Sequence, residues 1–252
     1  MFSHVDALYL PRIAETREHV AQSIGRLLAE LDGEAALLGF LLEYGAMRIG
    51  PLQRLPIWLR AAANAAAEEG HEAVAEELQL AASREVGHRK LLIVDLVMQR
   101  EVWYRRVATA NLCLGSLVWQ ASAQQHAALR EAAAKDPRGM IATELELADF
   151  GRVFGPALVE KCRSLLGSDA EDCMGFVQAR AEDACSRAGV RLARLDALLR
   201  DDPERAASWA AESSRVIRSY LDALVSCVER RPRPSGASRR WSSEASASIE
   251  LR

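Results

Sequence analysis

A glutamate and a histidine three positions apart, Glu85 and His88, lie in the stretch ELQLAASREVGHRKLLIVDL at residues 77–96. If this stretch is helical, both side chains project with a row of apolar ones, namely Val74, Leu78, Ala81, Leu92 and Leu96. An ionised carboxylate buried without a partner is costly, so we expect a specific group to satisfy it. Two kinds of partner fit. One is a hydrogen bond or ion pair from another helix, and the other is a metal ion, because Glu at i and His at i+3 point the same way.

A second inward acid is expected in the segment MIATELELADFGRVFGPALVEKCRSLLG, which we predict to be helical over residues 139–166. At 100° per residue, Glu144 projects with the apolar positions of this segment. Glu146 projects instead near Asp149 and Glu160, on a face expected to be wet. Two inward acids and one inward histidine on separate helices suit either a buried polar network or a metal site.

The stretch REVGHRKLLIVDL, the acid-bearing helix around Glu144 and the order and length of the later helices resemble the heme-oxygenase-like helical superfamily. Within it the chain is most similar to the non-heme di-iron oxidases and oxygenases, which are related in fold to thiaminase II and pyrroloquinoline quinone synthase. The resemblance covers roughly residues 35–229. It implies an all-α bundle around a central cavity, and an O₂-dependent oxidative tailoring enzyme of bacterial secondary metabolism. The implied substrate is small and amino-acid-like or fatty-acid-like.

The resemblance also implies which residues would bind iron. In the family a first helix supplies Glu and His, a middle helix supplies Glu, and a later helix supplies His-x-x-x-Asp-x-x-His. The matching positions in this chain are Glu85, His88, Glu144 and Asp183. Ala179 and Ser186 stand at the two histidine positions of the later helix, and neither side chain offers an imidazole. The implied cofactor is therefore one or two non-heme iron ions held by an incomplete ligand set.

Helical projection of the segment at residues 170–200 places Asp183 off the apolar stripe, on a face shared with Arg180, Arg187 and Arg194. If that face is solvated, Asp183 pairs with Arg187 at i,i+4. If it faces the cavity, the arginines suit an anionic group on a substrate or cofactor. Three functions therefore stay open: an iron-dependent oxidase, a metal-free ligand-binding or partner protein on the same scaffold, and a metal-free enzyme using the same cavity.

Other residues that could do chemistry have simpler explanations. His126 falls in a polar stretch and is expected to be exposed, so it does not supply a second histidine ligand. Trp103 and Tyr104 are expected in the core or at its rim. Cys113 is the candidate nucleophile that a thiaminase-like reaction would need, although no adjacent base is visible.

The elements that position these residues are predicted to be helices, because Ala, Leu, Arg and Glu dominate and β-branched alternation is nearly absent. Breaks at LDGE, RIGP, EEGH, KDPRG, LLGSD and RDDPE divide the chain into about seven or eight helices. From His71 onward the predicted helices are 71–99, 101–133, 139–166, 170–200 and 204–229. The apolar pattern before residue 70 is shorter and interrupted.

We predict one helical domain over residues 1–230, followed by a disordered Pro/Ser/Arg-rich tail at 231–252 or a basic arm anchored by Trp241. The chain has 252 residues, 50% of them hydrophobic, and a formal net charge of −3. This near-neutral charge gives no reason to expect nucleic acid or a membrane as a partner. Five cysteines without a CxxC pair indicate reduced thiols and hence a cytoplasmic protein. The expected partner is a small-molecule substrate, and the sequence leaves a homodimer open.

Overall fold

The computed structural model describes residues 3–107 and 116–229, and within these ranges every regular element is a helix. The elements in chain order are η1 (Val5–Tyr9), α1 (Leu10–Ala29), α2 (Glu34–Glu68), α3 (Glu72–Arg106), α4 (Ser116–Lys135), η2 (Pro137–Gly139), α5 (Met140–Leu166), α6 (Asp169–Cys173), α7 (Gly175–Asp201) and α8 (Arg205–Glu229). The prediction of an all-α chain with about seven or eight helices is confirmed. Cys113 and the predicted tail at 231–252 lie outside the described residues.

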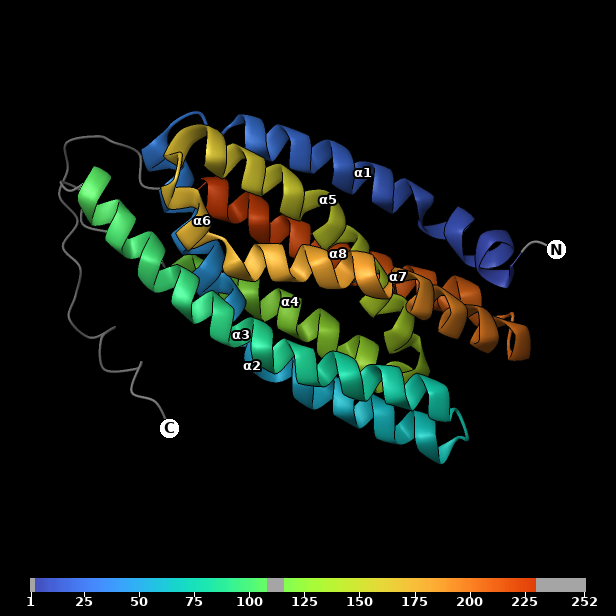
Figure 1. The fold of residues 1–252 in the computed structure, drawn as a ribbon. Coiled ribbons are helices and arrows are strands. Elements are labelled where there is room, and N and C mark those ends of the chain that lie inside the picture. Colours follow the sequence, from blue (N-terminus) through green and yellow to red (C-terminus); the bar gives the residue numbers. More distant parts are fainter. Residues whose placement is uncertain (1–2, 108–115, 230–252) are drawn as a thin grey trace.

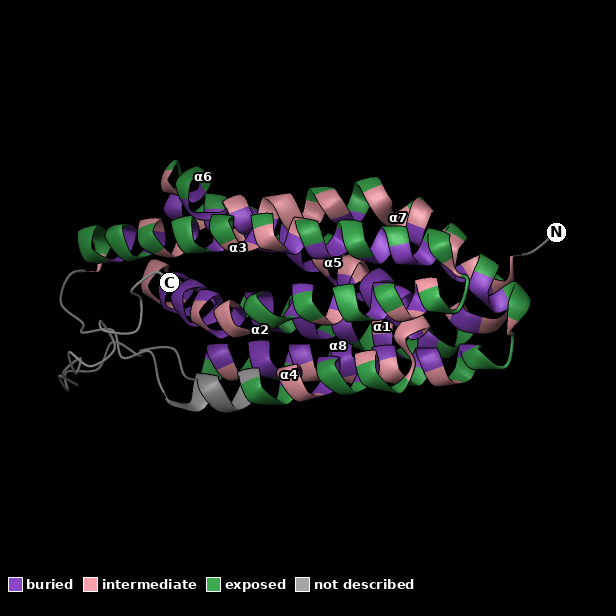
Figure 2. Cartoon of the chain, turned by 90° about the horizontal axis from the view of Figure 1, so that it is seen from below, coloured by how far each residue is buried: buried purple, intermediate pink, exposed green. Residues whose placement is uncertain are grey.

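The helices run side by side along one long axis, with α1 along one side and the α2–α3 hairpin along the other (Figure 1). A short turn at Gly70, whose φ is +83°, joins the two long helices of this hairpin. Helix α5 packs mainly against α7, and α4 packs about equally against α8 and α2. Buried residues face the interior of the bundle, whereas exposed residues follow the outer faces of the helices (Figure 2).

Three predicted helix boundaries are wrong. The predicted helix at 170–200 is two elements, because α6 ends at Cys173 and α7 begins at Gly175. Helix α2 continues through the expected break at RIGP and contains both Pro51 and Pro56. Helix α3 runs through residue 100 to Arg106, so the predicted helix at 101–133 does not exist as one element. A proline removes one backbone hydrogen bond, but burial against neighbouring helices can outweigh that loss. Both prolines are buried in this way.

Little space is left where the resemblance implies a central cavity. Helices α5 and α7 approach so closely that a Cβ added at Gly155 would lie 3.0 Å from Cβ of Ala181. The interior cavity beside them, lined by Tyr44, Phe154, Arg180 and other residues, has a volume of about 20 Å³. A cavity of that size holds about one water molecule. Among the described helices, none is both long and apolar enough to cross a membrane.

Close packing at η2 gives a first testable prediction. A Cβ added at Gly139 would lie 2.6 Å from Cδ1 of Trp209, whose indole Nε1 donates to Asp136 Oδ2 at 2.9 Å. The fixed indole cannot easily move away, so Gly139→Ala should lower the free energy of unfolding by about 1–3 kcal/mol. Gly25→Ala, at an open position within α1, should instead raise it by about 0.5–1 kcal/mol. Urea denaturation measures both; equal stabilities for the two variants would contradict the prediction.

Candidate functional site

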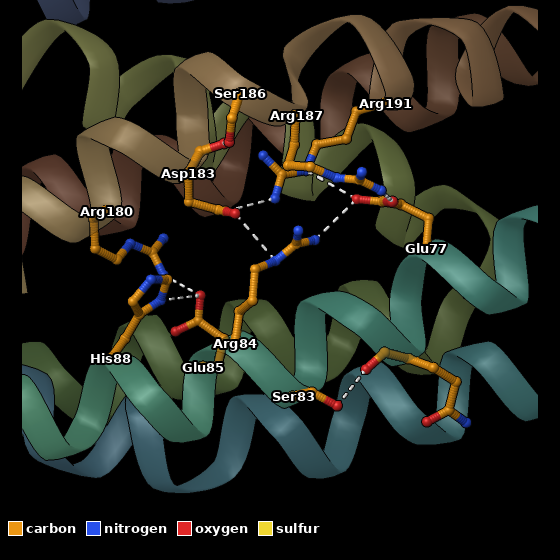
Figure 3. A network of polar contacts seen from close by, with 11 residues as sticks. Glu77, Ser83, Arg84, Glu85, His88, Arg180, Asp183, Ser186, Arg187 and Arg191 are labelled. Carbon is orange, nitrogen blue, oxygen red and sulfur yellow. Dashed lines mark hydrogen bonds and ion pairs between the residues drawn. The ribbon is translucent and has the colours of Figure 1, made fainter.

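The interior contains a group of charged side chains that we call the buried charge layer. It comes mainly from the facing sides of α3 and α7 (Figure 3), and α2 and α5 contribute one residue each. Its members are Arg48, Glu77, Arg84, Glu85, His88, Glu144, Arg180, Asp183, Arg187 and Arg191. The acids and the histidine predicted as iron ligands all belong to this layer.

Glu85 is bound by an arginine of α7. It is only 3% exposed, and its Oε1 accepts a hydrogen bond from Nη1 of Arg180. The Nδ1 of His88 lies 3.5 Å from the same oxygen, at the edge of hydrogen-bonding distance, and the His88 ring meets Phe176 edge-on. Burial alone would raise the pKa of Glu85, but the charge of Arg180, together with His88 and Arg48, lowers it to about 2. Glu85 is therefore an ionised carboxylate held by a guanidinium.

Asp183 is held by two further arginines. Its carboxylate contacts Nε of Arg84 at 3.1 Å and Nη2 of Arg191 at 2.9 Å. Arg187, the partner expected at i,i+4, instead donates to Glu77, which Arg84 also contacts at 3.1 Å. Of the two predicted orientations of this face of α7, the structure has the inward one, in which the arginines point towards α3 (Figure 3).

Glu144 faces the interior as predicted, and it is 4% exposed. Among the described residues, its Oε1 has no hydrogen-bond partner. Burial raises the pKa of Glu144 to about 7, since the favourable charge of Arg191 is partly opposed by the negative charge of Glu85. The titration range of Glu144 therefore includes neutral pH.

The predicted surface position of Glu146 is wrong. Glu146 is 3% exposed, and its two carboxylate oxygens accept hydrogen bonds from Nε and Nη2 of Arg17, each at 2.8 Å. Burial raises the pKa of Glu146 despite this ion pair. Helical projection of α5 by itself correctly places Glu146 on a polar face. It cannot show that α1 packs over that face and supplies an arginine to Glu146.

Three residues that support the site were not found from the sequence. Asp95 accepts hydrogen bonds from the backbone N–H groups of Gly175 at 3.0 Å and Phe176 at 2.8 Å, and so anchors the first turn of α7. Burial raises the pKa of Asp95 to about 6 in spite of these bonds. Arg48 is buried, with its guanidinium 4.6 Å from the ring centroid of Tyr220. Arg191 is also buried. The available signal was an isolated charge within an apolar run, as in LLEYGAMRIG around Arg48.

The other sequence predictions have mixed outcomes. Trp103 is buried in the core, as predicted, whereas Tyr104 is 51% exposed and does not lie in the core. His126 is half-buried and meets the ring of Trp58 edge-on, so the expectation of an exposed histidine is wrong. Burial lowers the pKa of His126.

The side chains as arranged do not fit an iron ion. Oε1 of Glu85 is occupied by Arg180, and Asp183 is occupied by Arg84 and Arg191. A guanidinium has no lone pair to offer a metal, and its charge repels a dication. Within residues 3–107 and 116–229, no group of three or more His, Cys, Asp or Glu side chains is placed to hold a metal. The assignment of Glu85, His88, Glu144 and Asp183 as ligands stays a prediction.

No protein-family model, no curated protein and no solved structure matches the chain. The heme-oxygenase-like arrangement therefore stays a prediction as well.

The Glu85–Arg180 pair gives a second prediction. Glu85→Gln leaves the guanidinium of Arg180 buried without its counter-charge, and breaking a buried pair in this way costs about 3–5 kcal/mol of unfolding free energy. The double variant Glu85→Gln/Arg180→Met removes both charges and should recover part of that loss. Urea denaturation of the two variants measures the difference. A single variant as stable as the wild type would show that water already compensates Arg180.

Glu144 gives a third prediction, on pH dependence. Its folded-state pKa of about 7 lies above the ordinary 4.5, so the folded state binds this proton more tightly and stability falls as pH rises between these values. Glu144→Gln removes this loss and should be more stable than the wild type at about pH 8, by up to about 3 kcal/mol. At about pH 4.5 the difference should nearly vanish. Glu160→Gln, an exposed position on the same helix, is the control and should show no such pH dependence. Equal pH profiles for Glu144→Gln and the wild type would contradict the assigned pKa.

Proposed function

We propose that this chain is a metal-free helical protein that acts by binding a partner rather than by oxygen chemistry. The observation that carries the proposal is the guanidinium of Arg180, which donates to Oε1 of Glu85, the first acid of the implied iron-ligand set. The pKa of this guanidinium is raised by Glu85 and Glu144, although burial acts in the opposite direction. Arg180 is therefore a permanent positive charge between the two acids.

The rest of the interior supports the same function. Glu77, Glu85 and Asp183 each contact at least one arginine, so the charges of these three acids are compensated within the buried charge layer. The interior cavity of about 20 Å³ is far smaller than an amino acid or a fatty acid, since small-molecule sites enclose about 300–1,000 Å³. Buried ion networks of this kind fix how helices pack, and do not need a ligand to do so.

An iron-dependent oxidase is the second candidate, because one feature of the site favours it. Glu85 and His88 project together from α3 towards α5, where Glu144 has an oxygen without a hydrogen-bond partner among the described residues. These residue types are iron ligands in carboxylate-rich helical sites. Iron binding would require Arg180 to release Glu85.

Anaerobic titration of the full chain with Fe(II) separates the two candidates and is our fourth prediction. A metal-free protein should retain close to zero iron per chain after desalting, because Arg180 and the other arginines repel a dication from the acids. Glu85→Ala should leave this value unchanged, as should the control Glu160→Ala on the exposed face of α5. A stoichiometry of one or two irons that is lost in Glu85→Ala but kept in Glu160→Ala would replace the proposal with the oxidase.

A further inference from the structure

Helix α3 carries an exposed row of apolar residues on the face opposite the core. Along the second half of the helix, the side chains of Leu91, Val94, Val97 and Tyr104 are all exposed to solvent, and Val94 is 57% exposed. The buried residues of the same helix, among them Glu85, lie on the other side. This outward face of α3 is visible from below in Figure 2, where exposed residues follow it over much of its length.

The row has the spacing of a helix–helix interface. Positions separated alternately by three and four residues form one stripe on a helix and are the positions that meet in a coiled coil. We call this stripe the α3 seam, and its members are Gly87, Lys90, Val94, Val97, Glu101 and Tyr104. From Gly87 to Tyr104 the seam is about 26 Å long at 1.5 Å per residue.

The α3 seam is complementary to itself when two copies run antiparallel about a two-fold axis between residues 95 and 96. In this register Val94 of one copy faces Val97 of the other. Lys90 faces Glu101, so opposite charges meet twice across the axis. Tyr104 faces Gly87, where a Cβ would have no neighbour within 4 Å and an aromatic ring has room. A parallel pair would instead place Lys90 against Lys90 and Glu101 against Glu101, which is repulsive.

We propose that the α3 seam is the interface of an antiparallel homodimer, in which the partner is a second copy of this chain. This inference rests on the proposed function in one respect, since it identifies the binding partner proposed there as a second copy of the chain. An isologous interface needs one surface patch that is complementary to itself, and the register of charges, valines, Tyr104 and Gly87 meets this requirement. The seam lies on the outward face of α3, so the dimer leaves the buried charge layer intact.

Sedimentation velocity of the full chain at concentrations from about 1 to about 100 µM tests the dimer, a range that covers affinities typical of weak to moderate complexes. The wild type should have the mass of a dimer. Val94→Glu/Val97→Glu places four like charges around the two-fold axis and should give a monomer with unchanged helical circular dichroism. Ile57→Glu, at an exposed apolar position on α2, is the matched control and should stay dimeric.

Charge exchange tests the antiparallel register. Lys90→Glu alone should raise the dimer dissociation constant by about tenfold or more, because it sets like charges opposite each other. Lys90→Glu/Glu101→Lys restores opposite charges and should bring the constant back near the wild-type value. A dimer that responds equally to the single and the double variant would overturn the register.

Two other outcomes would overturn the proposal as a whole. One is a wild type that is monomeric over the full concentration range, or a dimer unaffected by Val94→Glu/Val97→Glu. The other is a monomer that dimerises only when residues 230–252 are removed, since the C-terminal segment would then occupy the seam. Neither outcome alters the iron stoichiometry, so failure of the dimer is distinguishable from failure of the proposed function.

Discussion

The ion pair between Glu85 and Arg180 is the interaction on which the arrangement of α3 and α7 depends. Each charge would be strongly unfavourable in this interior without the other, because desolvation of an ion is only offset by a close and well-oriented partner. The pair therefore fixes the distance and the register between the two helices. Asp95 reinforces this register, since it binds the first turn of α7 from the same helix that carries Glu85.

The register between α3 and α7 also determines which of their other charged side chains form ion pairs. Within one helical turn of the central pair, Asp183 reaches Arg84 across the interface. About two turns from the pair, Arg187 reaches Glu77 in the opposite direction. Positive and negative side chains therefore alternate across the interface between α3 and α7, so that most of the acids contact an arginine (Figure 3). Glu144, which comes from α5, is the exception, because it is buried and its Oε1 has no hydrogen-bond partner among the described residues. Its raised pKa is the consequence.

For several buried side chains the sequence correctly predicted that they point inward, but it could not predict which residues they contact. Helical periodicity alone places Glu85, His88 and Glu144 inward, because it depends only on each helix by itself. It fails for Glu146, because the arginine that neutralises it comes from α1, more than a hundred residues earlier in the chain. The same limit explains α2, in which Pro51 is a break by local rules but is buried against other helices in the fold.

Helix α3 departs from the usual distribution of side chains on both of its faces. Its inward face places Glu77, Glu85, His88 and Asp95 among apolar residues, while its outward face carries valine, leucine and tyrosine beside charged residues such as Lys90 and Glu101. Apolar burial therefore contributes less on the inward side than in an ordinary amphipathic helix, and ion pairs contribute more. A helix held in this way keeps apolar surface in contact with water, which is unfavourable until that surface is covered. The homodimer proposed above would cover this surface of α3.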